Sequence, residues 1–120
     1  MANPIKSITL EGSWFFVAWT QGEVIGYAQF FMRPGEDKSG ELPRIYVLPE
    51  WQKKGIGSLL LQEGLFALKQ AGAVHLFVTV EKDNLIGRRF YEKQGFTQSR
   101  EFMYELAGLE LPMVEYRLDL

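Results

Sequence analysis

The sequence contains no cysteine and only one histidine, His75, among its 120 residues. Without cysteine the chain cannot have a disulfide framework, a thiolate nucleophile or a cysteine-based zinc site. A single histidine cannot form a histidine cluster, so we expect no metal site. His75 opens a predicted strand, where we expect a structural role for it.

Long apolar runs and an excess of basic charge are also lacking. No stretch approaches the roughly 18 apolar residues of a membrane span, and the opening MANPIKSITL has no apolar signal-peptide core. The formal net charge is −2 at pH 7, whereas nucleic-acid binders present a basic face. We therefore expect a single soluble, cytoplasmic domain, 1–120, that binds neither membrane nor nucleic acid.

The most informative stretch, Leu42 to Gln70, predicts a strand, a short turn and a helix. The β-branched and aromatic residues at 45–47 are typical of a buried strand, which ends at Pro49 because proline has no N–H for a ladder. Apolar residues then recur at helical spacing until Ala71-Gly72 stops the helix. This predicted apolar face consists of Ile56, Leu59, Leu60, Leu65, Phe66 and Leu68.

The turn between strand and helix has the composition of an anion site. Two glycines allow a close approach of the backbone, and the first N–H groups of a helix have no partner within the helix. Two lysines add positive charge, so a diphosphate fits this turn. The turn is too short for a Walker A loop and lacks the third glycine of a dinucleotide fingerprint. A plain connection with solvated lysines explains the same residues, which are Gln52, Lys53, Lys54, Gly55, Ile56, Gly57 and Ser58.

Two longer motifs favour the functional interpretation. Val47 to Leu61 reads Val-x-Pro-x-Trp-Gln-x-x-Gly-Ile-Gly-Ser-x-Leu-Leu and resembles motif A of the GNAT family of N-acetyltransferases. Asn84 to Phe96 resembles motif B of that family, N-x-x-A-x-x-F-Y-x-K-x-G-F, with Gly87 in place of the alanine. The resemblance implies an α/β fold: a mixed, mostly antiparallel sheet with a central splayed pair of parallel strands.

The apolar runs and turn residues agree with that fold. They predict the order β-β-β-α-β-α-β-β, with a polar loop at 33–41 before the central strand and a turn containing Gly108 and Pro112 before the last one. A strand–helix–strand crossover of this length makes the central pair parallel. The remaining predicted strands are 14–20, 24–32, 74–80, 96–104 and 113–118, and the second helix is 85–94.

The resemblance covers roughly residues 12–120. Compared with most of the family, the chain lacks the first strand and the two helices that shape the acceptor pocket. Three interpretations remain open: residues 4–10 supply a remnant strand, a partner chain covers the exposed sheet face, or the acceptor site is open. Because an uncovered apolar sheet face is a liability, we expect a homodimer.

The resemblance implies acetyl-coenzyme A (acetyl-CoA) as the cofactor. Its pantetheine arm would bind the free backbone of Ile45, Tyr46 and Val47, and its pyrophosphate would bind the glycine turn. Asn84 matches an asparagine expected to contact the cofactor chain, and a plain helix N-cap explains it equally well.

Tyr91 matches the tyrosine that lies near the thioester sulfur in the family. A phenol, with a pKa near about 10, can protonate a leaving thiolate whose conjugate pKa is about 8.5. The alternative is a core tyrosine packed beside Phe90 and Phe96. The acceptor amine must also lose a proton, to a carboxylate, through water or to bulk solvent. Glu81 is the first candidate carboxylate and Glu41 the second, and we expect Tyr46 to line the same cleft.

Arg88 and Arg89 lie on the motif B helix, where they meet the 3′-phosphate of the cofactor or simply face solvent. A loose similarity to bacterial polyamine acetyltransferases suggests a small primary amine as the acceptor. Aminoglycosides, amino acids and protein N-termini remain open, as do a cofactor-binding regulatory module without catalysis and a fragment of a larger assembly. The acidic residues that suggest a cationic acceptor are Glu101, Glu105, Glu110 and Glu115.

Overall fold

The computed structural model describes residues 5–10, 12–35 and 37–120. In these ranges one seven-stranded sheet, ordered β1-β2-β3-β4-β5-β7-β6, is accompanied by two α-helices and a short 3₁₀ helix. All neighbouring strands are antiparallel except β4 and β5. The elements are β1 (Ile5–Leu10), β2 (Ser13–Thr20), β3 (Glu23–Met32), β4 (Ser39–Val47), η1 (Pro49–Trp51), α1 (Ile56–Gln70), β5 (His75–Glu81), α2 (Leu85–Lys93), β6 (Thr97–Leu106) and β7 (Leu109–Asp119).

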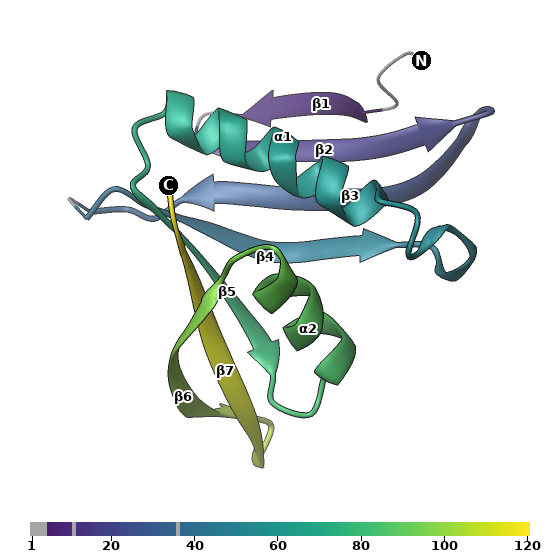
Figure 1. Cartoon of the computed structure of the whole chain (residues 1–120). Helices are drawn as coiled ribbons and strands as arrows, with labels where there is room; N and C mark the ends of the chain where they lie inside the picture. Colours follow the sequence, from purple (N-terminus) through teal and green to yellow (C-terminus); the bar gives the residue numbers. More distant parts are fainter. Residues whose placement is uncertain (1–4, 11, 36) are drawn as a thin grey trace.

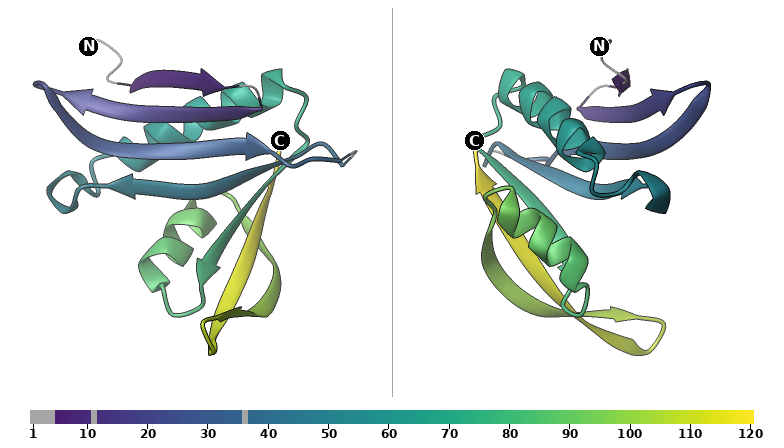
Figure 2. Two further views of the ribbon diagram at one scale, coloured as in Figure 1. Left: turned by 180° about the vertical axis from the view of Figure 1, so that it is seen from behind. Right: turned by 45° about the vertical axis from the view of Figure 1, so that its right-hand side comes forward.

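The sheet splits between β4 and β5. These parallel strands pair only at Ser39–Glu41 with His75–Phe77 and then diverge. Figures 1 and 2 show the result: β1–β4 and β5–β7 form the two arms of a V whose vertex lies at these three residue pairs. The splayed parallel pair expected from the resemblance is confirmed.

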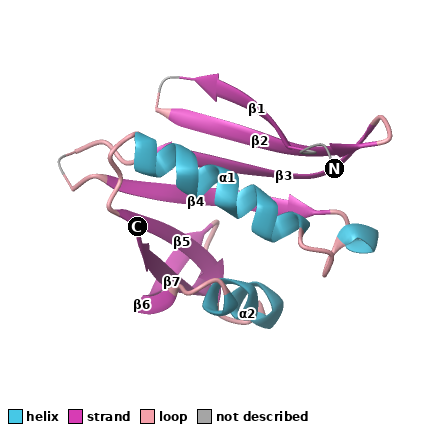
Figure 3. Ribbon diagram, turned by 45° about the horizontal axis from the view of Figure 1, so that its top comes forward, coloured by secondary structure: helices cyan, strands magenta, loops and turns pink. Residues whose placement is uncertain are grey.

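Both helices lie on one face of the sheet (Figure 3). On β4, a Cβ built on Gly40 would lie 2.7 Å from the side chain of Leu68, so α1 packs directly on this strand. On β7, Tyr116 projects from the same face and donates a hydrogen bond of 2.6 Å to Glu92 of α2. The opposite face carries no helix in the described ranges, and we call it the helix-free face.

The buried face of α1 excludes two residues of the predicted apolar face, Leu59 and Phe66. The helix buries residues spaced by three and four positions, whereas the exposed fractions of Leu59 and Phe66 are 42% and 65%. These two residues are seven positions apart and therefore share a neighbouring stripe of the helix. The buried residues of α1 are Ile56, Leu60, Leu61, Gly64, Leu65 and Leu68.

The edge strand β1 and the start of the central strand β4 add to the strands that the sequence predicts. Ile5–Leu10 forms β1, which pairs with β2, so the remnant-strand interpretation is correct for these residues; Pro4 lies outside the described ranges. The central strand begins at Ser39, inside the predicted polar loop 33–41. Ser39 and Gly40 are both buried, and Gly40 leaves no room for a side chain beneath Leu68. Serine and glycine are common in loops, so the sequence predicted a loop at these two positions.

The last strand also begins earlier than predicted, because the turn consists of Ala107 and Gly108 while Pro112 lies inside β7. The carbonyl of Pro112 accepts a hydrogen bond of 2.9 Å from the N–H of Lys82, which follows the end of β5. Since N–H and C=O of one strand residue point to the same side, the missing N–H faces the end of β5, where no ladder bond is lost.

The helices and the first hairpin agree with the sequence prediction. α1 ends at Gln70, α2 begins at Leu85, and the residues Gln21 and Gly22 turn the chain between β2 and β3 with positive φ angles of 50° and 75°. No helix in the described ranges is long and apolar enough to cross a lipid bilayer.

Candidate functional site

The N-terminus of α1 lies between the end of β4 and α2. Gly55 occupies the N-cap position with φ 84°, and no side chain of the described residues caps the helix. The first helical bond runs from the N–H of Leu59 to the carbonyl of Gly55, so the amides of residues 56–58 precede it. These amides lie at the positive end of the helix dipole and are the groups that the sequence predicts to bind an anion.

The turn before α1 carries the predicted cationic side chains on its surface. Lys53 and Lys54 are both exposed, and the Nζ of Lys54 lies 5.2 Å from the ring centre of Trp51. The Nε2 of Gln52 donates a hydrogen bond of 3.0 Å to the carbonyl of Val47, which ties the turn to the end of β4. The turn therefore holds two lysines next to the uncapped amides.

The splay leaves one edge of β4 without a strand partner. Residues 42–47 follow the last rung with β5, and within this segment Ile45, Tyr46 and Val47 pair only with β3 on the other edge. Backbone groups on such an edge can bind an extended chain that carries amides. In this conformation, however, the carbonyl of Val47 is already bound to Gln52.

α1 and α2 touch across the open end of the V. A Cβ built on Gly57 would lie 3.2 Å from the ring of Phe90, so a residue larger than glycine would push against α2. The Nε2 of Gln94 donates a hydrogen bond of 2.8 Å to the hydroxyl of Ser58. Motif A and motif B thus meet at this point, which their separation in the sequence does not reveal.

Asn84 caps α2 through its side-chain oxygen, which accepts a hydrogen bond of 3.0 Å from the N–H of Gly87. A Cβ built on Gly87 would lie 2.7 Å from the Nδ2 of Asn84. The glycine that departs from the motif B pattern therefore leaves room for this amide. The N-cap interpretation of Asn84 describes its contacts in the structure.

Tyr91 is the only residue of α2 that is fully buried, with an exposed fraction of 7%. Its ring packs against Phe90, Phe96 and Tyr116, with centroid distances of 5.4, 5.5 and 6.2 Å. Burial raises the pKa of Tyr91 to about 12, because the phenolate would lose its hydration. The hydroxyl therefore stays protonated at neutral pH and is available as a donor.

Tyr116, beneath α2, was not singled out by its sequence context. Its hydroxyl accepts a hydrogen bond of 3.0 Å from the Nε of Arg88 and donates one to Glu92. Arg88 also donates to the carbonyl of Lys82 and so holds the loop before α2. In this structure, Arg88, one of the two arginines considered for the 3′-phosphate, therefore binds groups of the protein itself. Arg89 is exposed on the same helix.

The candidate bases differ in their environments. Glu81 ends β5 and is exposed, without an ion pair among the described side chains, whereas Glu41 is bound by Arg33. Tyr46 is 46% exposed on the helix-free face, and its ring centre lies 6.0 Å from that of Tyr27. His75 begins β5 and pairs with Asp119 at 2.9 Å, which agrees with the structural role expected for it.

The acidic residues near the C-terminus do not form one acidic surface. Glu101 pairs with Lys82 at 3.0 Å, and Glu115 is largely buried beside two arginines. Glu105 and Glu110 face each other at the end of the β6–β7 hairpin. No group of three or more potential metal ligands occurs in the part of the chain that the structure describes.

The fold and these motifs define an acyltransferase-like domain with a split sheet and an uncapped helix start at the open end of the split. The family model for the acetyltransferase (GNAT) family matches residues 5–96, and the chain belongs to this family.

Known proteins similar to this chain include two curated relatives and one solved structure. The chain is 37% identical over 114 residues to the uncharacterized N-acetyltransferase YuaI of Bacillus subtilis, with coverage of 91% of this chain and 63% of the relative. It is 30% identical over 95 residues to a spermidine N(1)-acetyltransferase of Thermoplasma acidophilum, covering 76% and 57%. An acetyltransferase from Salmonella typhimurium, solved with its cofactor acetyl-CoA, has a TM-score of 0.76 and 26% identity, covering 90% and 65%. The matches thus span less than two thirds of each of these proteins.

Proposed function

We propose that this chain binds acetyl-CoA and transfers its acetyl group to the primary amine of a small molecule, by direct attack in a ternary complex. The cofactor supplies an activated acetyl group as a thioester. The residues proposed to bind it are the backbone of Ile45, Tyr46 and Val47, the turn Gln52–Ser58, and Asn84.

The observation that carries this proposal is the combination of a splayed strand edge with an uncapped helix start. A free edge at β4 suits an arm containing two amides, and the adjacent amides of residues 56–58 suit a diphosphate. Lys53 and Lys54 add charge complementarity. Adjacent chain segments therefore suit the pantetheine arm and the diphosphate of coenzyme A.

The proposed chemistry assigns a role to each of two side chains on the β5–β7 arm, Tyr91 of α2 and Glu81 of β5. The amine nitrogen attacks the thioester carbon, the C–S bond breaks, and Tyr91 donates a proton to the leaving sulfur. The proton lost by the amine passes to Glu81, directly or through water. Glu81 is favoured over Glu41 because Arg33 already neutralises the Glu41 carboxylate.

The acceptor class is supported by the relatives more than by side-chain charge. The similarity to a spermidine acetyltransferase favours a polyamine-like amine, so spermidine is the first acceptor to assay. Amino acids, aminoglycosides and peptides with a free N-terminus complete the panel.

Calorimetric titration with acetyl-CoA tests the cofactor site. Replacing both turn lysines, Lys53→Gln/Lys54→Gln, should weaken binding about tenfold at low salt, because two charges near the phosphates are lost. The matched control is Lys69→Gln/Lys93→Gln, which removes two lysines from the last turns of α1 and α2. Gly57→Asp is a less specific test, because its Cβ would lie 3.2 Å from the ring of Phe90 and would disturb the packing of α1 on α2 as well as the charge.

Absence of binding by the parent protein would contradict the proposal. Binding without acetylation of any amine in the panel would instead favour a regulatory or assembly module that holds acetyl-CoA without catalysis.

A homodimer is part of this proposal, because the helix-free face exposes apolar side chains. Ile8 is 61% exposed, and Phe15 and Tyr27 stack with their ring centres 5.6 Å apart on this face. A second copy covering the face would remove this area from water. Light scattering at micromolar concentration checks the assembly, and a monomer would contradict it.

A further inference from the structure

An arginine bridge crosses the sheet at the vertex of the V. The backbone N–H of Arg33 donates a hydrogen bond of 2.8 Å to the carbonyl of Ser39, which fixes the residue at the base of the β3–β4 loop. Its guanidinium carbon lies 4.1 Å from the ring centre of Phe77 on β5. Phe77 pairs with Glu41 in the last rung between β4 and β5, so the guanidinium covers the point where the strands separate.

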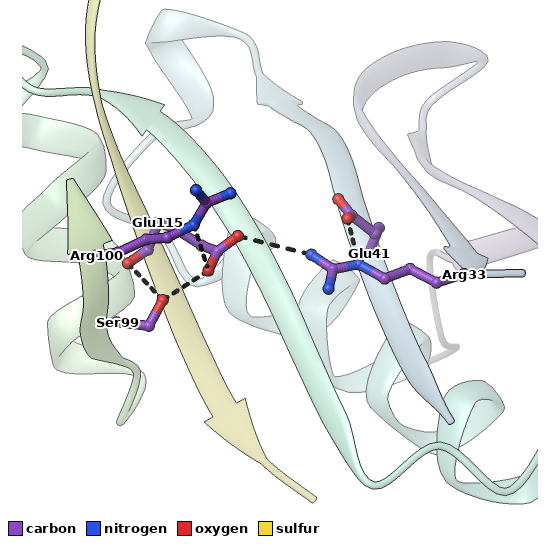
Figure 4. Close-up of polar contacts among 5 residues, drawn as sticks. All are labelled: Arg33, Glu41, Ser99, Arg100 and Glu115. Atoms are coloured by element: carbon purple, nitrogen blue, oxygen red, sulfur yellow. Dashed lines mark hydrogen bonds and ion pairs between the residues drawn. The ribbon is translucent and has the colours of Figure 1, made fainter. Parts of the chain in front are cut away.

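The same guanidinium binds a carboxylate on each arm (Figure 4). The Nε of Arg33 donates to Glu41 of β4, and its Nη2 lies 3.6 Å from the Oε2 of Glu115 on β7. Arg33 therefore connects β4 with β7 across the intervening strand β5. We call Arg33, Glu41 and Glu115 the vertex bridge.

The β7 end of the vertex bridge is itself held in place. Glu115 is buried, with 8% of the residue exposed, and its Oε1 accepts hydrogen bonds from the hydroxyl of Ser99 at 2.8 Å and the Nε of Arg100 at 3.4 Å. A register shift in β6 between Gln98 and Arg100 allows both neighbouring residues to reach this carboxylate. A buried carboxylate requires such partners, so Glu115 has a fixed position.

The position of this bridge matters because little else joins the arms within the sheet. Only three residue pairs connect β4 to β5, and the α1–α2 contact at Gly57 and Ser58 lies on the other face. We infer that the vertex bridge sets the opening of the V, and that Arg33 is thereby a positioning residue for the pantetheine arm. This inference rests on the proposed binding of acetyl-CoA.

If Arg33 positions the pantetheine arm, replacing it should weaken the binding of a ligand that has this arm and leave the binding of a ligand without it unchanged. Coenzyme A spans the V with its pantetheine arm, whereas adenosine 3′,5′-bisphosphate has no arm and needs only the phosphate site on the β1–β4 side. Arg33→Met should raise the Kd for coenzyme A about five- to tenfold and leave the Kd for the bisphosphate unchanged. The KM for acetyl-CoA should rise in parallel with the Kd for coenzyme A.

The matched control is Arg117→Met, which removes an arginine that pairs with Asp119 within the same strand, at 3.2 Å. It should leave both ligands unaffected. Arg33→Lys keeps the charge and should recover part of the affinity, although lysine lacks the planar fork that reaches two carboxylates.

Calorimetric titration at a temperature where circular dichroism shows each variant folded distinguishes the outcomes. Equal weakening of both ligands, or no change for coenzyme A, would overturn the inference. If Arg33→Met does not fold, Glu41→Gln removes only the partner on β4, and a selective loss of coenzyme A affinity is again required. Failure of the parent protein to bind coenzyme A would contradict the proposed function, whereas a parent that binds and an Arg33 variant without this selective loss would contradict only this inference.

Discussion

The two arms of the V are built in different ways. The β1–β4 arm and α1 enclose a continuous apolar core that includes Phe30, Leu60 and Leu68, each with 0% exposure. On the other arm, α2 buries only Tyr91, and all but one residue of β6 are exposed. The second arm is therefore held by a smaller core and by polar contacts such as those of Tyr116.

In the proposed site, the two arms also contribute different kinds of groups. The apolar arm carries backbone groups, namely the edge of β4 and the amides at the start of α1, which need a rigid support. The more polar arm supplies the side chains with chemical roles, Tyr91 and Glu81. Variants that act on one arm alone can test whether the arms are separable.

The largest effect is expected from a core truncation in the first arm. Leu68→Ala should lower the free energy of unfolding by about 2–5 kcal/mol, because it leaves a cavity where α1 packs on Gly40 of β4. Denaturant unfolding measures the loss. The control is Leu59→Ala on the same helix, where the leucine is 42% exposed and a much smaller loss is expected. Equal losses would contradict the assignment of the core.

In the second arm, Tyr91→Phe should reduce kcat at least about 100-fold if the hydroxyl protonates the leaving sulfur. The ring and its packing remain, so the KM for acetyl-CoA should change little. Tyr104→Phe is the matched control, because Tyr104 is 50% exposed on β6. Steady-state rates decide the matter, and full turnover by Tyr91→Phe would remove this residue from the mechanism.

Alkaline unfolding provides a second test of Tyr91. Burial raises its pKa from an ordinary value of about 10 to about 12, so between these values the folded protein keeps a proton that the unfolded chain loses. The free energy of unfolding should therefore fall as the pH rises through this window, by about 2–3 kcal/mol from this residue. Tyr91→Phe should lose this part of the pH dependence. The measurement is denaturant unfolding at a series of pH values, and identical pH profiles of variant and parent would contradict it.

The sequence predicted the elements whose patterns are local. Alternating apolar residues located the hairpin, and the glycine turn, the cap at Asn84 and Gly95 located the helices. It missed the first residues of β4 and β7, because Ser39, Gly40 and Pro112 are typical of loops yet are tolerated by specific neighbours.

The site was predictable to the extent that it follows two contiguous motifs. The vertex bridge was not, because it joins residues 33, 41 and 115, which only the folded sheet brings together. Tyr116 was missed for the same reason, since its partners Arg88 and Glu92 lie on a helix that precedes it by more than 20 residues. Long-range polar contacts of this kind leave no periodic signal.

The smallest effect is expected when Tyr116 loses only its hydroxyl. Tyr116→Phe should cost about 1 kcal/mol of unfolding free energy, because Arg88 keeps its bond to the carbonyl of Lys82 and the exposed Glu92 returns to water. Since these contacts attach α2 to β7, the loss should appear as faster amide hydrogen exchange in α2, with α1 unchanged. Tyr104→Phe again serves as the control. Faster exchange in both helices would mean that the two arms unfold as one unit, and that the apolar arm does not fold independently of the polar one.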